Sequence, residues 1–153
     1  MLLTKAGYQR ELILELRQKL HSHAEPSMSE YKTKALLMDF LHQHTSLQLV
    51  DRGRWFYAYH AGDGDAGAQG PIALRADFDA VVCGDGCARH LCGHDGHSAI
   101  LAGVALALEQ LQTSRDVYLI FQPGEETGQG GALCSQLLGW SLRPQRKASD
   151  RGL

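Results

Sequence analysis

The residues with the clearest chemical potential lie in one short segment, residues 90–97, with the sequence HLCGHDGH. Cys thiolate, His nitrogen and carboxylate oxygen, all present in it, are the usual ligands of zinc and the neighbouring first-row metals. In an extended segment Cys92 and His94 share one face, and Gly93 between them lets the chain turn tightly. A polar loop of merely solvated histidines is the alternative, but this density favours a metal site, in which Asp95 can orient a ligand imidazole.

A pair of adjacent glutamates, Glu125 and Glu126, follows an apolar run later in the chain. If the backbone is extended there, the two side chains point in opposite directions, so one can bind metal while the other serves as a base. Amide hydrolysis needs both functions, a metal that acidifies water and polarises the carbonyl and a carboxylate that relays the proton. An acidic surface turn explains an isolated pair equally well. The preceding apolar run and the following glycines favour the catalytic interpretation modestly.

Two aspartates form a third candidate group. Asp77 and Asp79 flank Phe78, and side-chain alternation predicts that both carboxylates point to the same side. They are candidates for metal ligands, for supports behind the ligands, or for caps of the following loop.

The cysteines suggest an alternative metal site. Cys83 and Cys87 are four residues apart, a spacing compatible with a disulfide or a zinc knuckle. Together with His90 and Cys92 they form a candidate structural zinc module. This alternative is weaker than the catalytic one because the usual Cys-x2-Cys spacing is missing.

Helices are predicted from the apolar periodicity. Leucines recur every four residues along one face of residues 8–22. A second helix is predicted to begin at a capping box of Ser27 and Glu30 and to end near His44. A third, at about 97–111, is apolar on nearly all sides, so we expect it to be buried.

Strands are predicted at 47–51, 54–60, 71–76 and 116–122, the last two as buried strands. Residues 77–96 are expected to be irregular, and a short helix is expected near 130–138. Helices that alternate with apolar strands indicate the α/β class, a sheet flanked by helices. Sites in such sheets gather beyond the carboxyl ends of strands, and both acidic clusters follow a strand in this way.

The composition is that of one ordinary globular domain. Hydrophobic residues make up 44% and charged residues 21% of the 153, and the formal net charge is −2. This balance indicates no nucleic-acid partner. The longest apolar run, residues 99–108, is too short to span a membrane, and no signal peptide is recognisable, so we expect no membrane partner and a reducing, cytoplasmic location with free thiols.

Four ordered segments together resemble the M20 metallopeptidase family, in its amidohydrolase branch of hippurate, auxin-conjugate and N-acyl-amino-acid hydrolases. RQKLHSHAE at 17–25 is similar to the family's R-x-x-L-H-x-H-P-E, with Ala24 in place of proline. ALRADFDA at 73–80 is similar to LRADMDAL, HLCGHDGHSA at 90–99 to HACGHDGHTA, and FQPGEE at 121–126 to FQPAEE. The resemblance extends over nearly all of residues 10–138.

The resemblance implies a role for each matched residue. Cys92, His94 and Glu126 would be metal ligands, Glu125 the general base, and Asp79 a support behind the ligands. The implied reaction is hydrolysis of the amide bond of an N-acyl amino acid, in which Glu125 takes a proton from the attacking water and passes it to the leaving amine. Two divalent metal ions per complete site, commonly Zn, Mn, Co or Ni, are implied as cofactors.

The departures from the family are as informative as the matches. Family members are well over twice as long, carry a lid and dimerisation domain, and supply two further histidine ligands, whereas this sequence has no histidine after His97. We therefore expect residues 1–140 to be the N-terminal part of the catalytic domain, C-terminally truncated, without the lid and with impaired activity. Residues 141–153 are expected to be a disordered tail. The alternative is a non-catalytic metal-binding fragment, and in either case a homo-oligomer or association through uncovered apolar surface is expected.

Overall fold

The computed structural model describes residues 5–64 and 70–138 of the chain. The tail predicted at 141–153, and the domain boundary expected before it, lie outside these residues. None of the helices in the described ranges is long and apolar enough to cross a membrane.

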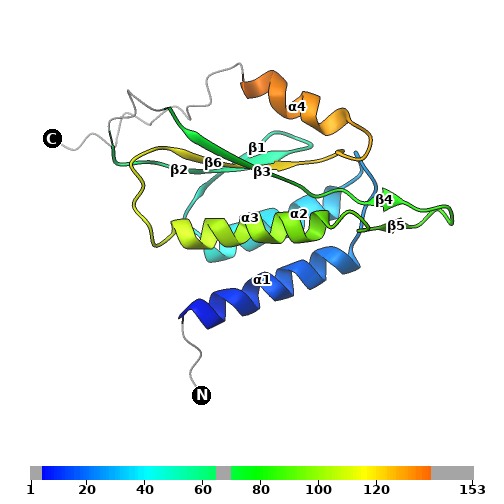
Figure 1. Ribbon diagram of the computed structural model, residues 1–153, viewed down its shortest axis with the longest axis horizontal. Helices are drawn as coiled ribbons and strands as arrows, with labels where there is room; N and C mark the ends of the chain where they lie inside the picture. The colour runs from blue at the N-terminus through cyan, green and yellow to red at the C-terminus, as the bar shows by residue number, and fades with distance from the viewer. Residues whose placement is uncertain (1–4, 65–69, 139–153) are drawn as a thin grey trace.

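A mixed sheet organises the fold, with the strand order β1-β2-β6-β3 (Figure 1). Its strands are β1 (Gln48–Asp51), β2 (Phe56–His60), β3 (Ile72–Asp77) and β6 (Val117–Gln122). β2 pairs antiparallel with β1 and with β6, while β3 and β6 are parallel, with Asp77 opposite Gln122. Since parallel strands end at the same edge of a sheet, the acidic loops that follow β3 and β6 begin side by side at this edge.

Helices cover both faces of this sheet (Figure 1). On one side lie α1 (Lys5–Ser22), α2 (Tyr31–His44) and α3 (His94–Leu108), and on the other lies α4 (Gln129–Leu138). The connection from β3 to β6 runs through α3, as parallel pairing requires a long crossover. The predicted α/β class, a sheet flanked by helices, is confirmed.

Period-two alternation along the strands builds two cores. Facing α1, α2 and α3 are Phe56, Ala58, Leu119 and Phe121, which pack with the buried leucines of these helices. Facing α4 are Trp55, Tyr57, Tyr118 and Ile120, which pack with Cys134. β6 is buried along its whole length, as the continuous apolar run predicts.

The predicted capping box is wrong. α2 begins at Tyr31, and its first turn receives no hydrogen bond from the side chain of the cap residue, Glu30. The Ser27 hydroxyl instead donates to Asp79, and the Glu30 carboxylate accepts from the backbone N–H of Gly124. Both side chains are used by loops distant in the sequence, and local spacing cannot reveal such contacts.

The stretch 77–96, predicted to be irregular, contains a short hairpin. Its strands are β4 (Val81–Val82) and β5 (Ala88–Arg89), paired antiparallel. α3 also begins at His94, three residues before the predicted start. The candidate metal-binding segment, residues 90–97, therefore runs from the end of a hairpin into the first turn of a helix.

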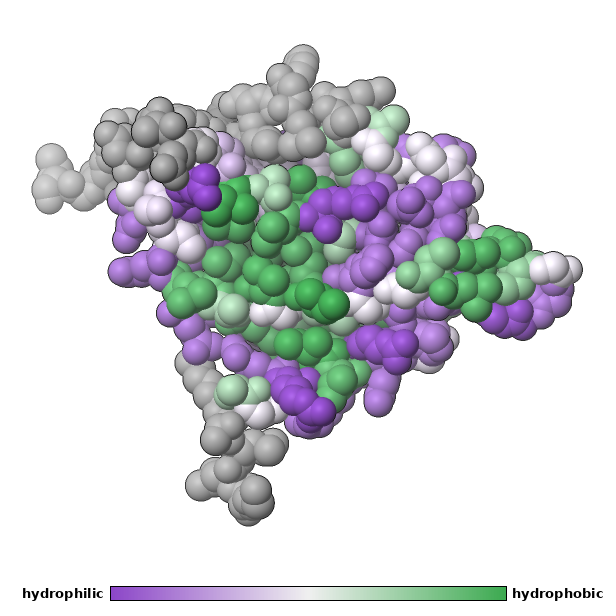
Figure 2. All heavy atoms as spheres, viewed as in Figure 1, coloured by the Kyte–Doolittle hydropathy of each residue, from purple (hydrophilic) through white to green (hydrophobic). Residues whose placement is uncertain are grey.

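β3 is an edge strand of the described sheet, and the expectation that it is buried is wrong for its middle residues. Leu74 is 40% exposed, and Ile100 on α3, which packs against β3, is 67% exposed. Figure 2 shows apolar side chains gathered on this face, over α3 and β3. The uncovered apolar surface expected from the sequence is present there.

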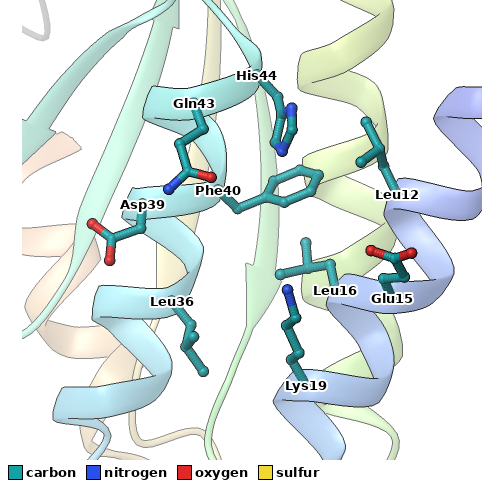
Figure 3. Close-up of a pocket in the computed structure, with 9 residues that line it drawn as sticks. All are labelled: Leu12, Glu15, Leu16, Lys19, Leu36, Asp39, Phe40, Gln43 and His44. Atoms are coloured by element: carbon teal, nitrogen blue, oxygen red, sulfur yellow. The ribbon is translucent and has the colours of Figure 1, made fainter.

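A groove between α1 and α2 is separate from the acidic loops (Figure 3). Its apolar residues are Leu12, Leu16, Leu36 and Phe40, and its polar ones are Glu15, Lys19, Asp39, Gln43 and His44. None of the thiols or carboxylates of the predicted site lines it.

The central strand gives a test of the fold. Replacing Leu119, which is fully buried in β6, by alanine leaves a cavity and is expected to lower the free energy of unfolding by about 2–5 kcal/mol. Urea denaturation measures the change. Leu111→Ala is the matched control, because Leu111 is 56% exposed, and a loss as large as that of Leu119→Ala would contradict the placement of the two residues.

Candidate metal centre

His94 lies at the centre of the candidate site, at the first position of α3. The cap residue before it, Gly93, has φ +80°, a left-handed conformation that favours glycine. The His94 ring is buried, and its Nδ1 lies 3.0 Å from Oδ1 and 3.1 Å from the backbone oxygen of Asp79. Because both oxygens accept, Nδ1 carries the proton and donates, and the lone pair of His94 belongs to Nε2.

Three carboxylates face this Nε2. Its distances are 3.8 Å to Asp77 Oδ2, 3.7 Å to Glu125 Oε2 and 3.7 Å to Glu126 Oε1. They are too long for hydrogen bonds. They are close to the separation of two ligands that share one ion, roughly 3.4 Å for tetrahedral bonds of about 2.1 Å.

The Cys92 thiol completes a group that can hold a metal ion. One donor atom each of Cys92, His94 and Glu126 lies within 4.8 Å of the others. Glu126 is the main cause of a raised pKa of the Cys92 thiol, through a hydrogen bond, with smaller effects of burial and of the charges of Glu126, Glu125 and Asp79. Without a cation the thiol therefore keeps its proton, and a divalent ion would displace that proton on binding. The donor set and its negative charge fit such an ion.

Asp77, His94 and His97 form a second such group, with donor atoms also within 4.8 Å of one another. His97 Nδ1 lies 2.7 Å from Asp77 Oδ1, and Arg75 lies 3.0 Å from Asp77 Oδ2. Burial raises the pKa of Asp77, but the His97 hydrogen bond and the charges of His94 and Arg75 outweigh this effect and hold the pKa below its usual range. The sequence contained a signal for His97, because residues three apart on a helix share a face. The signal can be used only when the helix is taken to begin at His94.

Asp79 connects the parts of the site and is fully buried. Oδ1 accepts from His94, while Oδ2 accepts from the Ser27 hydroxyl at 2.5 Å and from the backbone N–H of Glu126 at 3.0 Å. Glu30 Oε1 accepts from the backbone N–H of Gly124 at 2.8 Å. The segment between α1 and α2 thus holds both acidic loops in place.

All five residues to which the family resemblance assigns a role come together. Cys92, His94 and Glu126 form one group, Glu125 borders it at His94 Nε2, and Asp79 holds the opposite nitrogen of His94. The expectation that the Asp77 and Asp79 carboxylates point to one side also agrees with the geometry, since both lie against the His94 ring.

The orienting role predicted for Asp95 is wrong, because its carboxylate does not face a candidate ligand. Asp95 Oδ2 contacts His21 and Arg17 of α1, and Asp79 orients His94 instead. Asp95 follows His94 on a helix, where consecutive side chains diverge by about 100°. The extended conformation assumed for this segment ends at the helix start.

The structure does not assemble the alternative zinc module. Among the described residues, neither of the two potential metal-binding groups contains Cys83 or Cys87. These two cysteines close the turn of the β4–β5 hairpin through a backbone hydrogen bond, and all four cysteines are free thiols. His90 is buried, whereas Cys92 is exposed, and no potential metal-binding group of the described residues contains both.

Comparison with known proteins identifies the family. Residues 73–150, half of the chain, match the model of peptidase family M20/M25/M40. The chain therefore belongs to this family. A solved structure of the Bacillus subtilis YXEP protein, described as a dinuclear metal binding peptidase from M20 family, superimposes with a TM-score of 0.76 at 28% identity, covering 88% of this chain and 41% of that one. The expected fold, part of an M20-type catalytic domain, is confirmed.

Two curated relatives carry names that specify a reaction. The chain is 31% identical over 136 residues to N-acetyldiaminopimelate deacetylase of Exiguobacterium sibiricum, covering 80% of this chain and 35% of the relative. It is 32% identical over 131 residues to N-acetyl-L-cysteine deacetylase of Bacillus subtilis, covering 77% and 31%. Across eight curated relatives the chain spans between 16% and 35% of their length.

The acidic surroundings of Cys92 give a test of the site geometry. In the metal-free chain, Glu126→Gln removes the main cause of the raised thiol pKa, so Cys92 is expected to ionise at lower pH and to react faster with iodoacetamide at a given pH. Alkylation rates across a pH series, resolved by peptide mass spectrometry, measure the effect. Cys87, an exposed thiol in the hairpin turn, is the control within the same molecule. Identical Cys92 profiles in the two proteins would contradict the contact.

Proposed function

We propose that this chain carries the metal-and-base part of a site that hydrolyses the amide bond of N-acyl amino acids. One observation carries the proposal: His94 Nε2, with its other nitrogen held by Asp79, faces Glu125 and Glu126 at 3.7 Å. The names of the two deacetylase relatives support N-acyl amino acids as the substrate class.

Cys92, His94 and Glu126 are the proposed holders of a divalent cation. When bound, such an ion would lower the pKa of water and polarise the amide carbonyl. A mixed set of sulfur, nitrogen and oxygen donors suits zinc, cobalt or nickel, and manganese is a further candidate. Two ions per complete site are part of the proposal, supported by the dinuclear description of the YXEP protein.

Glu125 is the proposed general base. Its side chain is 44% exposed and borders the ligand group at His94, whereas the side chain of Glu126 is 23% exposed. The attacking water, entering from solvent, therefore meets the Glu125 carboxylate. This carboxylate can accept a proton from the water and deliver it to the leaving amine. Asp79 holds the backbone of the two glutamates in place by accepting a hydrogen bond from the backbone N–H of Glu126.

A non-catalytic metal-binding role for the isolated chain is the second candidate. Each potential metal-binding group within residues 5–64 and 70–138 has three members, and the two groups share His94. The sequence also has no histidine after His97 to supply a further imidazole. We therefore propose that this chain, taken alone, turns over substrate slowly or not at all.

The cellular location and the assembly of the chain are also proposed here, each from one feature of the structure. Four free thiols are compatible with a reducing compartment such as the cytoplasm. The exposed Leu74 and Ile100 support association through the apolar face of β3 and α3, as a homo-oligomer or with a protein partner.

Metal stoichiometry and amidase activity, measured on the same purified chain with Zn or Mn and a panel of N-acyl amino acids, test the function. Glu125→Gln is expected to retain the metal and to lower kcat by about 10²–10⁴-fold, because proton transfer is lost. Glu126→Gln is expected to lose metal and activity together, and Glu15→Gln on α1 is the control that changes neither.

Each outcome separates the candidates. Metal binding without turnover would favour the non-catalytic role of the isolated chain. Turnover that survives Glu125→Gln would remove Glu125 from the role of base. A chain that binds no metal at all would overturn both candidates.

A further inference from the structure

Two residues of α1 hold a single buried carboxylate of α3. Arg17 Nε lies 3.0 Å and His21 Nδ1 lies 2.7 Å from Asp95 Oδ2. The Asp95 side chain is completely buried, whereas those of Arg17 and His21 are about half exposed. Breaking a buried ion pair leaves an uncompensated charge, so these two contacts, with a backbone hydrogen bond from Gly96, stabilise the Asp95 carboxylate in this position.

The spacing of Arg17 and His21 follows from the packing of α1. Residues four apart share a helix face, so both side chains reach the same carboxylate. The neighbouring face carries Leu16 and Leu20, which are buried in the main core and fix the rotation of α1 about its axis. Neither the metal centre nor the proposed proton transfer uses Arg17 or His21.

Asp95 stands next to the candidate ligands in the chain. It directly follows His94 and is three residues after Cys92. Between the two ligands lies Gly93, at φ +80°, where an added Cβ would meet no atom within 4 Å, so side-chain packing does not restrain that residue. Asp79 fixes the imidazole ring of His94, but it does not fix the backbone that carries Cys92.

We propose that Arg17 and His21 are positioning residues of the metal centre. By holding Asp95 they fix the first turn of α3, and with it the separation of Cys92 Sγ and His94 Nε2. The inference rests on the proposed function insofar as Cys92, His94 and Glu126 bind the ion. His90 supports the same arrangement, because its buried ring packs beside that of His21, with centroids 6.1 Å apart.

Cobalt(II) binding to the full chain tests the proposal without any assay of activity. Coordination by Cys92 gives a thiolate-to-cobalt charge-transfer absorption, and titration gives the dissociation constant. In the double variant Arg17→Ala/His21→Ala we expect about 10–100-fold weaker cobalt binding, the usual cost of losing a group that orients metal ligands. We also expect a weaker charge-transfer band per bound cobalt.

Lys19→Ala/His23→Ala is the matched control. It makes the same kinds of change at the same spacing on α1, and the structure records no contact of either side chain with Asp95. The control is expected to bind cobalt as the unaltered chain does. Circular dichroism and the thermal midpoint of each protein separate loss of the fold from loss of the centre.

The outcomes distinguish this inference from the proposed function. If the double variant folds and binds cobalt with unchanged affinity and spectrum, Arg17 and His21 do not position the centre. If the double variant does not fold, the single variant His21→Gln decides, with weaker binding expected and unchanged binding overturning the proposal. If the unaltered chain shows no thiolate-to-cobalt band, the proposed metal site fails and this inference fails with it.

Discussion

The candidate centre depends on the buried carboxylate of Asp79 more than on any other group. One of its oxygens accepts from the His94 imidazole, and the other accepts from the Ser27 hydroxyl and the Glu126 backbone N–H. Three segments that are far apart in the sequence therefore meet at one side chain. The side chain is fully buried, and its orientation is fixed by these donors.

The parallel pairing of β3 and β6 is what makes this meeting possible. The register that sets Asp77 opposite Gln122 brings the loop after β3 to the loop after β6, and the α3 crossover between them begins at His94. The proposed metal ligands and the proposed base thus come from consecutive pieces of one β-α-β unit. The helices on one side and α4 on the other keep β6 buried along its whole length, so the unit is a rigid platform for short polar loops.

The fold and the residues that meet at the candidate site could be predicted because their signals are local. Apolar periodicity located the helices and strands within a few residues, and the ordered motifs named Cys92, His94, Glu125, Glu126 and Asp79. Some failures are local, such as the missed β4–β5 hairpin, but those at Ser27, Glu30 and Asp95 involve contacts made at a distance. Ser27 and Glu30 satisfy a local capping pattern but are bound by Asp79 and by the loop after β6, and Asp95 pairs with α1 across more than 70 residues. Sequence spacing carries no record of such partners.

The crowding of carboxylates around His94 links the stability of the chain to its metal supply. Asp77, Glu125 and Glu126 converge on one nitrogen, so in the absence of a cation like charges repel where the two strands end. An ion that binds the folded chain and not the unfolded one adds about 2.7 kcal/mol at a free concentration 100 times its dissociation constant. The thermal midpoint would then rise and fall with the free metal concentration around the protein. When the ion is scarce, the first effect would be a shorter lifetime of the folded chain.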